Sequence, residues 1–161
     1  MILSAYSVGV KKLNTIKACC GFGHRQVFDN ISERLYDCLL HIAEQGCVTF
    51  YTGAMGEFDS LYSATVRELK TKFPQIKLIC VKPYMTKDIN EMGAYLYTLY
   101  DDIIIPTELA DVHYKSVIKK RNRLLIDWSD VVICYVKRGY GGAYEAFKYA
   151  SKSGKCTVIK I

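Results

Sequence analysis

Short apolar runs alternate with amphipathic segments along the chain. The apolar runs are rich in Val, Ile and Cys and do not alternate with polar residues, a pattern typical of parallel strands that are buried on both faces. They predict five strands, over residues 15–20, 48–52, 76–82, 131–136 and 156–161.

Between these runs, hydrophobic residues recur at helical spacing. The spacing predicts helices over residues 31–42, 62–73, 114–128 and 143–150, with Pro74 ending the second and Gly154 the fourth. Asn30, followed three residues later by Glu33, is a weak capping-box signal for the first helix. Strands that alternate with helices form right-handed βαβ units. The pattern therefore predicts an α/β fold, a doubly wound and mainly parallel sheet of five or more strands with helices on both faces.

Residues 83–110 follow this pattern less regularly. Residues 90–100 are compatible with a helix, and residues 101–106 form an acidic, then apolar, extended segment. We interpret the whole stretch as a surface excursion between the third and fourth strands, which forms a lid or an interface.

Composition and charge narrow the class of protein. The 161 residues suffice for one domain spanning residues 1–161, and with half of them apolar and 24% charged a packed core can form. No apolar run approaches the roughly 20 residues that span a bilayer, and the N-terminus lacks a signal-peptide pattern. We therefore expect a soluble, cytoplasmic protein without a membrane partner. The formal net charge of +6 favours an anionic partner.

The seven cysteines predict neither disulfides nor zinc. Their number is odd and no C-x-x-C pair occurs, while most of them lie inside apolar runs, where a free cysteine acts as a small hydrophobic residue. Seven free thiols suit a reducing compartment. Because His41 and His113 also lack ligand-spaced partners, we predict no metal site and no cofactor.

Three glycine-containing loops follow predicted strands, and ligands of an open parallel sheet bind at the carboxyl ends of its strands. Glycines let the backbone approach a ligand closely, and bare N–H groups at a helix N-terminus attract anions. A tight structural turn is the alternative for each loop, and Asp59 is as compatible with a helix cap as with a ligand contact. The candidate ligand-binding residues of these loops are Gly21, Gly23, His24, Arg25, Gly53, Gly56, Asp59, Gly139, Gly141 and Gly142.

Arg121 lies on the apolar face of the third predicted helix. A charge on such a face must find a counter-anion, because an unpaired buried charge is costly. One interpretation is a structural salt bridge to Asp59, Glu145 or another carboxylate. The other is that its guanidinium clamps a phosphate through two hydrogen bonds.

The loops taken together resemble a known family. The run A-C-C-G-F-G-H-R at 18–25 is similar to the C-C-F-T-G-H-R opening of a bacterial family in the SLOG superfamily, the Rossmann-like group related to the lonely-guy phosphoribohydrolases and the DprA core. Residues 50–59, 121–130 and 140–146 resemble later motifs of that family, in its order and spacing. Phe22 replaces the family's threonine, and Ala54 stands where many members have a second glycine.

This resemblance implies a Rossmann-like sheet with a nucleotide-type ligand across its strand ends. It places Arg121 on the arginine and Glu145 on the glutamate that lonely-guy enzymes use to cleave nucleoside monophosphates, and it adds Asn122 to the ligand-binding residues. The Pro-Gly of that motif has become Lys137-Arg138, a departure that puts the hydrolase activity in doubt. The family precedent, together with the apolar segment 103–106, also makes a homo-oligomer the expected assembly.

Three functions are compatible with these features. The first is binding of a nucleotide-derived small molecule, either a mononucleotide or an ADP-ribose-like species. The second is a phosphoribohydrolase-like N-glycosidase with Glu145 and Arg121 as catalytic residues. The third, a DprA-like single-stranded nucleic-acid binder, is favoured by the net charge and by a basic run on one helix, but such a run is usually a solvated face, so we expect no nucleic-acid partner. The residues of that run are Lys115, Lys119, Lys120, Arg121 and Arg123.

Overall fold

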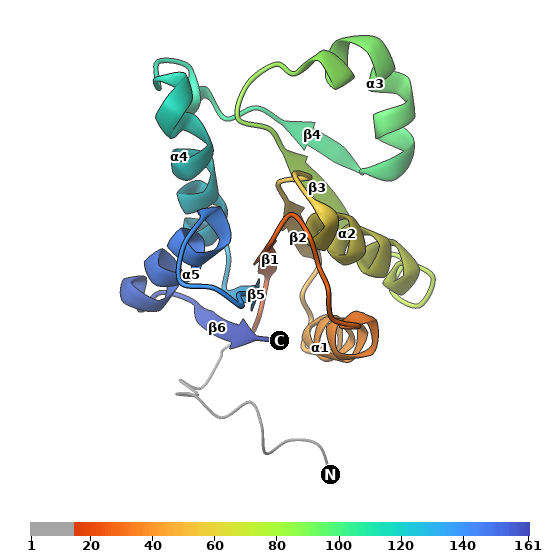
Figure 1. The fold of residues 1–161 in the computed structure, drawn as a ribbon. Helices are drawn as coiled ribbons and strands as arrows, with labels where there is room; N and C mark the ends of the chain where they lie inside the picture. The colour runs from red at the N-terminus through yellow and green to blue at the C-terminus, as the bar shows by residue number, and fades with distance from the viewer. Residues whose placement is uncertain (1–14) are drawn as a thin grey trace.

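Residues 15–161 are described by a computed structural model, in which six parallel strands form one sheet in the order β4-β3-β2-β1-β5-β6 (Figure 1). The predicted doubly wound α/β fold is confirmed, and five of the strands lie within the predicted runs or overlap them. The strands are β1 (Ala18–Gly23), β2 (Thr49–Thr52), β3 (Lys77–Val81), β4 (Asp102–Ile104), β5 (Val131–Tyr135) and β6 (Thr157–Lys160).

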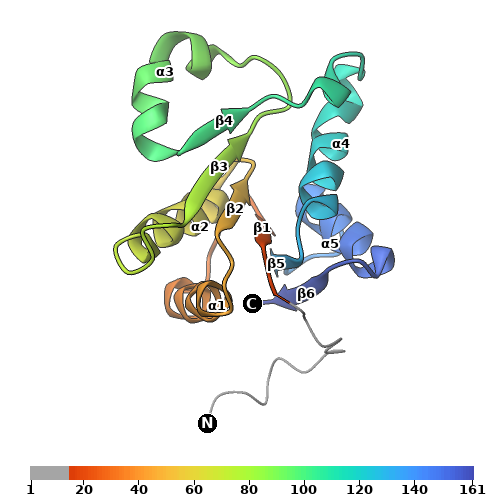
Figure 2. The same cartoon turned by 180° about the vertical axis from the view of Figure 1, so that it is seen from behind.

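Helices cover both faces of this sheet. Helices α1 (Ser32–Glu44) and α2 (Glu57–Leu69) pack on one face, and α4 (Tyr114–Asp127) and α5 (Gly142–Ser153) pack on the other (Figures 1 and 2). Each face has its own apolar core. Because successive side chains of a strand point to opposite faces, Cys19 of β1 lies in the α1–α2 core, whereas Cys20 and Phe22 lie in the α4–α5 core.

The cysteines are core residues, as predicted. All seven are free, and they are buried or half-buried. Burial raises the pKa of the Cys20 thiol, and the same cause raises the pKa of Cys38 to about 12. These thiols are therefore protonated and unreactive at neutral pH.

The helix ends differ in part from the sequence signals. The first helix begins at Ser32 without a capping box: the Asn30 Oδ1 atom accepts a hydrogen bond from the Ser32 N–H at 3.3 Å, and the N-cap residue is Ile31, whose side chain cannot accept one. Helix α2 ends at Leu69, before the apolar stripe reaches Phe73. Gly154 ends α5 as predicted, with a φ of 63° that favours glycine.

The segment 83–110 is not wholly a surface excursion. Residues Asp102–Ile104 form β4, which pairs with β3 at the edge of the sheet, so three residues of the predicted extended segment belong to the sheet itself. The preceding helix α3 (Lys87–Leu99) buries only Leu96 and lies outside both helical layers, as the two views show (Figures 1 and 2). The expected homo-oligomer through this segment stays a prediction. Within residues 15–161, no helix is both long enough and apolar enough to cross a bilayer.

Candidate functional site

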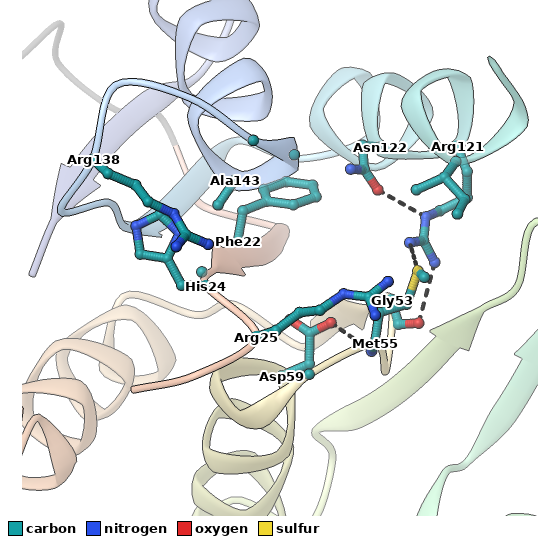
Figure 3. A pocket seen from close by; sticks show the side chains of 15 residues that line it. Phe22, His24, Arg25, Gly53, Met55, Asp59, Arg121, Asn122, Arg138 and Ala143 are labelled. Atoms are coloured by element: carbon teal, nitrogen blue, oxygen red, sulfur yellow. Dashed lines mark hydrogen bonds between the residues drawn. The ribbon is translucent and has the colours of Figure 1, made fainter. Parts of the chain in front are cut away.

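The direction of strand succession reverses between β1 and β5, since β2, β3 and β4 follow on one side of β1 and β6 follows on the other side of β5. Such a switch point leaves a crevice at the carboxyl ends of the strands. A cavity of about 230 Å³ opens there, and we call it the strand-end cavity (Figure 3). Its lining includes ten of the predicted residues: Gly23, His24, Arg25, Gly53, Gly56, Asp59, Arg121, Asn122, Gly141 and Gly142.

Three predicted residues do not line the strand-end cavity, namely Gly21, Gly139 and Glu145. Five further residues complete its lining: Phe22, Met55, Ile118, Arg138 and Ala143. Arg138 could have been found from the sequence, because it follows a predicted strand and precedes a glycine loop, as Arg25 adjoins the first glycine loop. The apolar lining residues carry no comparable signal.

Gly21 and Gly23 lie within β1 rather than in the loop that follows it. A Cβ atom on Gly21 would lie 2.8 Å from the ring of Tyr62, and one on Gly23 would lie 2.1 Å from the ring of Phe58. Both aromatic residues belong to α2 and are buried. Close packing of α2 on β1 therefore accounts for these two glycines; contact of either with a ligand stays a prediction.

His24 ties two of the site's loops together. Its Nε2 atom accepts a hydrogen bond from the Lys137 N–H at 2.9 Å, and its ring meets Tyr135 edge-on. Burial, with a smaller contribution from the charge of Arg138, lowers the pKa of His24 below its ordinary value. The imidazole is therefore neutral at pH 7, which suits an Nε2 atom that accepts a hydrogen bond.

The loop after β1 is also fastened to the start of α2. The Glu57 N–H donates to the Arg25 carbonyl at 3.0 Å, and the Val27 N–H donates to the Glu57 carboxylate at 2.7 Å. Gly56 permits this approach, because a Cβ atom there would lie 2.8 Å from the Arg25 Cα atom. The backbone of Arg25 is thus fixed, while its side chain is exposed along the cavity (Figure 3).

Asp59 fastens the loop after β2. Its carboxylate accepts a hydrogen bond from the Met55 N–H at 2.8 Å, one residue before the N-cap Gly56. Burial raises the pKa of Asp59 above its ordinary value, although the Met55 hydrogen bond and the charge of Arg121 oppose this rise. The Asp59 side chain therefore stabilises the loop that precedes α2, as a helix-capping residue does, and it also lines the cavity.

Arg121 is 2% exposed, and its guanidinium is already bonded within the protein. It donates to the Gly53 carbonyl at 3.2 Å and to the Asn122 Oδ1 atom at 2.9 Å (Figure 3). It also donates to the Val81 carbonyl at 2.5 Å. A Cβ atom on Gly53 would lie 2.7 Å from a guanidinium nitrogen, so this glycine leaves room for Arg121. Within residues 15–161 Arg121 forms no salt bridge, so the counter-charge we considered is replaced by carbonyl dipoles. A phosphate contact by Arg121 stays a prediction.

The loop after β5 leads into the bare N-terminus of α5. Gly141 is the N-cap residue with a φ of 91°, and no side chain caps the helix, so the first backbone N–H groups are free to attract an anion. Arg138 is exposed in the same loop and lies over the Tyr140 ring. Glu145, one turn into α5, lies outside the strand-end cavity and 3.6 Å from the Lys119 ammonium.

The described part of the chain contains no cluster of three or more His, Cys, Asp or Glu side chains that could hold a metal ion. The charged groups of the cavity are instead three arginines and one carboxylate, that of Asp59. This balance suits an anion.

Known structures share this fold. DNA processing protein A (DprA) from Helicobacter pylori, described for its single-stranded DNA binding mode, superposes with a TM-score of 0.61 at 18% identity, covering 89% of this chain and 65% of the other. DprA from Streptococcus pneumoniae gives 0.63 at 13% identity, over 89% and 50% of the two chains. TM1055 gives 0.54 at 16% identity, over 86% and 71%. No family model and no curated protein matches the sequence.

The chain therefore has a DprA-like, Rossmann-like fold and spans about half to two thirds of the length of those DprA chains. This finding corrects the expectation that nucleic acid is not a partner, because the fold is shared with a protein whose binding of single-stranded DNA has been described. Four residues of the basic run are exposed, as a solvated helix face requires, and only Arg121 is buried; the expectation was wrong because an exposed basic face does not exclude a nucleic-acid partner.

Proposed function

We propose that the strand-end cavity binds a nucleotide-type small molecule, a mononucleotide or an ADP-ribose-like species, through its phosphate. The observation that carries this proposal is the pair Arg25 and Arg138. Both are exposed, both line the cavity, and neither forms a salt bridge within residues 15–161. They follow β1 and β5, the two strands at the switch point.

The chemistry of these two side chains matches a phosphate. A guanidinium presents a planar fork of donors that binds phosphate oxygens in pairs. The bare N-terminus of α5 adds backbone donors and a positive dipole end on the same cavity wall. Phe22, Met55 and Ile118 supply apolar surface for a ribose or base.

Titration calorimetry with AMP, ADP-ribose and inorganic phosphate tests this proposal. AMP should bind the wild type, and Arg25→Ala and Arg138→Ala should each weaken it about tenfold, the loss expected for one charge-assisted contact. Lys77→Ala is the matched control, because Lys77 is exposed, forms no salt bridge in the described residues and begins β3, at the opposite end of the sheet's strands. Failure of AMP and ADP-ribose to bind the wild type, or an AMP affinity in both arginine variants equal to that of the wild type, would contradict the proposal.

The N-glycosidase alternative has less support. Glu145 does not line the cavity, and the Arg121 guanidinium is occupied by two carbonyls and an amide oxygen. We therefore expect AMP to be recovered intact after incubation with the protein, as judged by chromatography.

Single-stranded DNA is the second candidate ligand, and the observation in its favour is the fold shared with DprA. A labelled dT20 strand should then bind with an affinity that falls steeply as salt rises, since phosphate contacts release counterions. AMP would compete with the strand if both use Arg25 and Arg138. Salt-independent retention, or none, would remove this candidate.

A further inference from the structure

A second cavity, of about 220 Å³, adjoins the strand-end cavity between α4 and α5, and we call it the α4–α5 groove. Ile118, Asn122 and Gly142 line both cavities, so the two spaces meet at these residues. The two cavities are therefore direct neighbours, so a ligand of two linked units is short enough to occupy both. Nothing proposed above uses this space.

The groove carries the same sign of charge as the strand-end cavity. Lys115, Lys119 and Arg123 recur every fourth residue along α4, which places them on one face of the helix over about 12 Å. The only carboxylate that lines the groove in the described chain is Glu145, which lies 3.6 Å from Lys119. Lys115 and Arg123 form no salt bridge within residues 15–161.

The pairing of Lys119 with Glu145 does not block the groove. Both side chains are about half exposed, at 57% and 45%, and such pairs contribute little because water screens them. A phosphate that enters the groove can therefore replace Glu145 as the partner of the Lys119 ammonium with little loss of free energy.

Two side chains that line the groove, Arg123 and Tyr149, suit a planar ring. The Arg123 guanidinium lies 5.1 Å from the centre of the Tyr149 ring, and the Tyr149 hydroxyl donates to the Asp127 carboxylate at 3.0 Å, which fixes the ring on α5 against α4. Aromatic rings and guanidinium planes are the surfaces on which unpaired bases stack. The groove thus joins a site for an anion to a platform for a base.

We infer that the α4–α5 groove is a second nucleotide subsite, so that the preferred ligand is a unit of two nucleotides joined by phosphate, one in each cavity. This inference rests on the proposed function, because the strand-end cavity must hold the first phosphate. The shared chemistry fits two sources, a free dinucleotide or part of a single strand.

The test compares the affinities of 5′-phosphorylated pdA, pdA-dA and pdA-dA-dA-dA for the full chain by calorimetry. The wild type should bind pdA-dA at least about tenfold more tightly than pdA, the gain of one further charge-assisted contact. In the double variant Lys115→Ala/Arg123→Ala this gain should disappear, while the Kd for pdA changes less than the Kd for pdA-dA. Lys77→Ala/Lys155→Ala removes two exposed charges that line neither cavity and should keep the gain.

Glu145→Gln supplies an independent readout of opposite sign. Removing the groove's carboxylate should tighten pdA-dA several-fold without changing pdA, because repulsion of the second phosphate is lost. A gain that persists in the Lys115→Ala/Arg123→Ala variant, or an equal loss for pdA and pdA-dA, would overturn the second subsite. Failure of pdA to bind the wild type would instead refute the proposed function, the binding of a mononucleotide in the strand-end cavity. If pdA-dA binds more tightly than pdA but pdA-dA-dA-dA binds no more tightly than pdA-dA, the second subsite is supported and its ligand is a free dinucleotide. If the affinity rises further for pdA-dA-dA-dA, the second subsite is supported and its ligand is part of a single strand.

Discussion

The substitution Gly23→Ala should destabilise the protein because the added methyl group clashes with helix α2, and not because a ligand contact is lost. The added Cβ atom would lie 2.1 Å from Phe58 Cγ and 2.5 Å from Phe58 Cβ, where ordinary contacts need more than 3.4 Å. Phe58 cannot yield easily, because its side chain is fully buried and its ring stacks on Tyr135 at a centroid distance of 6.3 Å. Relief therefore requires α2 to move by more than 1 Å, and overpacking of this kind costs about 3 kcal/mol or more.

Urea unfolding followed by circular dichroism measures this loss. Gly139→Ala is the matched control, because nothing lies within 4 Å of a Cβ atom there, and its free energy of unfolding should change by less than about 0.5 kcal/mol. In a double-mutant cycle with Phe58→Ala, the two losses should be less than additive, since two of the three nearest atoms are removed. A Gly23→Ala protein as stable as the wild type, or strictly additive losses, would refute the packing explanation.

Three further predictions concern residues in and around the strand-end cavity. Ala54 has a φ of 51°, which favours glycine, so Ala54→Gly should raise the free energy of unfolding by about 1 kcal/mol in urea titrations. Arg121→Lys should lower it by about 2–4 kcal/mol, because one ammonium cannot replace the guanidinium on both carbonyls; an unchanged urea midpoint would contradict this. The lowered pKa of His24 means that the unfolded state takes up its proton first, so the free energy of unfolding should fall as pH drops from about 6.5 through the folded-state pKa. His24→Gln should reduce that slope between about pH 7.5 and 5.5, whereas an identical slope would show that His24 does not titrate as described.

The fold could be predicted from the sequence wherever burial dictates the pattern. Strand β5 is buried along its whole length, and its run of apolar residues was sufficient to locate it to within one residue. Strand β4 was not recognised as part of the sheet, because it is only three residues long, lies at the edge and keeps its side chains half exposed. The capping box at Asn30 failed for a local reason: the helix begins two residues later, so Asn30 contacts the N–H of Ser32 instead of capping the first turn.

The candidate site could be located but its contacts could not be assigned. Loop positions follow from the rule that strand ends gather at a switch point, and that rule found Arg25. Whether a guanidinium is free or already hydrogen-bonded depends on neighbours that are distant in sequence. Arg121 donates to the carbonyl of Val81, forty residues away, and no sequence pattern predicts that contact. The position of Arg138 after a predicted strand was visible in the sequence, but its exposure beside the cavity depends on how the loop after β5 folds.

The two glycines of β1 pack against two aromatic residues of α2. A motif search finds the glycines but not the aromatic residues that explain them. Gly21 and Gly23 are two residues apart on a strand, so they lie on the same face about 6.6 Å from each other. Phe58 and Tyr62 are four residues apart on a helix, so they lie on one face with a rise of about 6 Å. The two spacings match, and each ring occupies the space that a Cβ atom would take. A glycine pattern at a strand end can therefore arise from the helix layer behind the sheet, and our proposed phosphate site accordingly rests on Arg25 and Arg138, which line the cavity, rather than on these glycines.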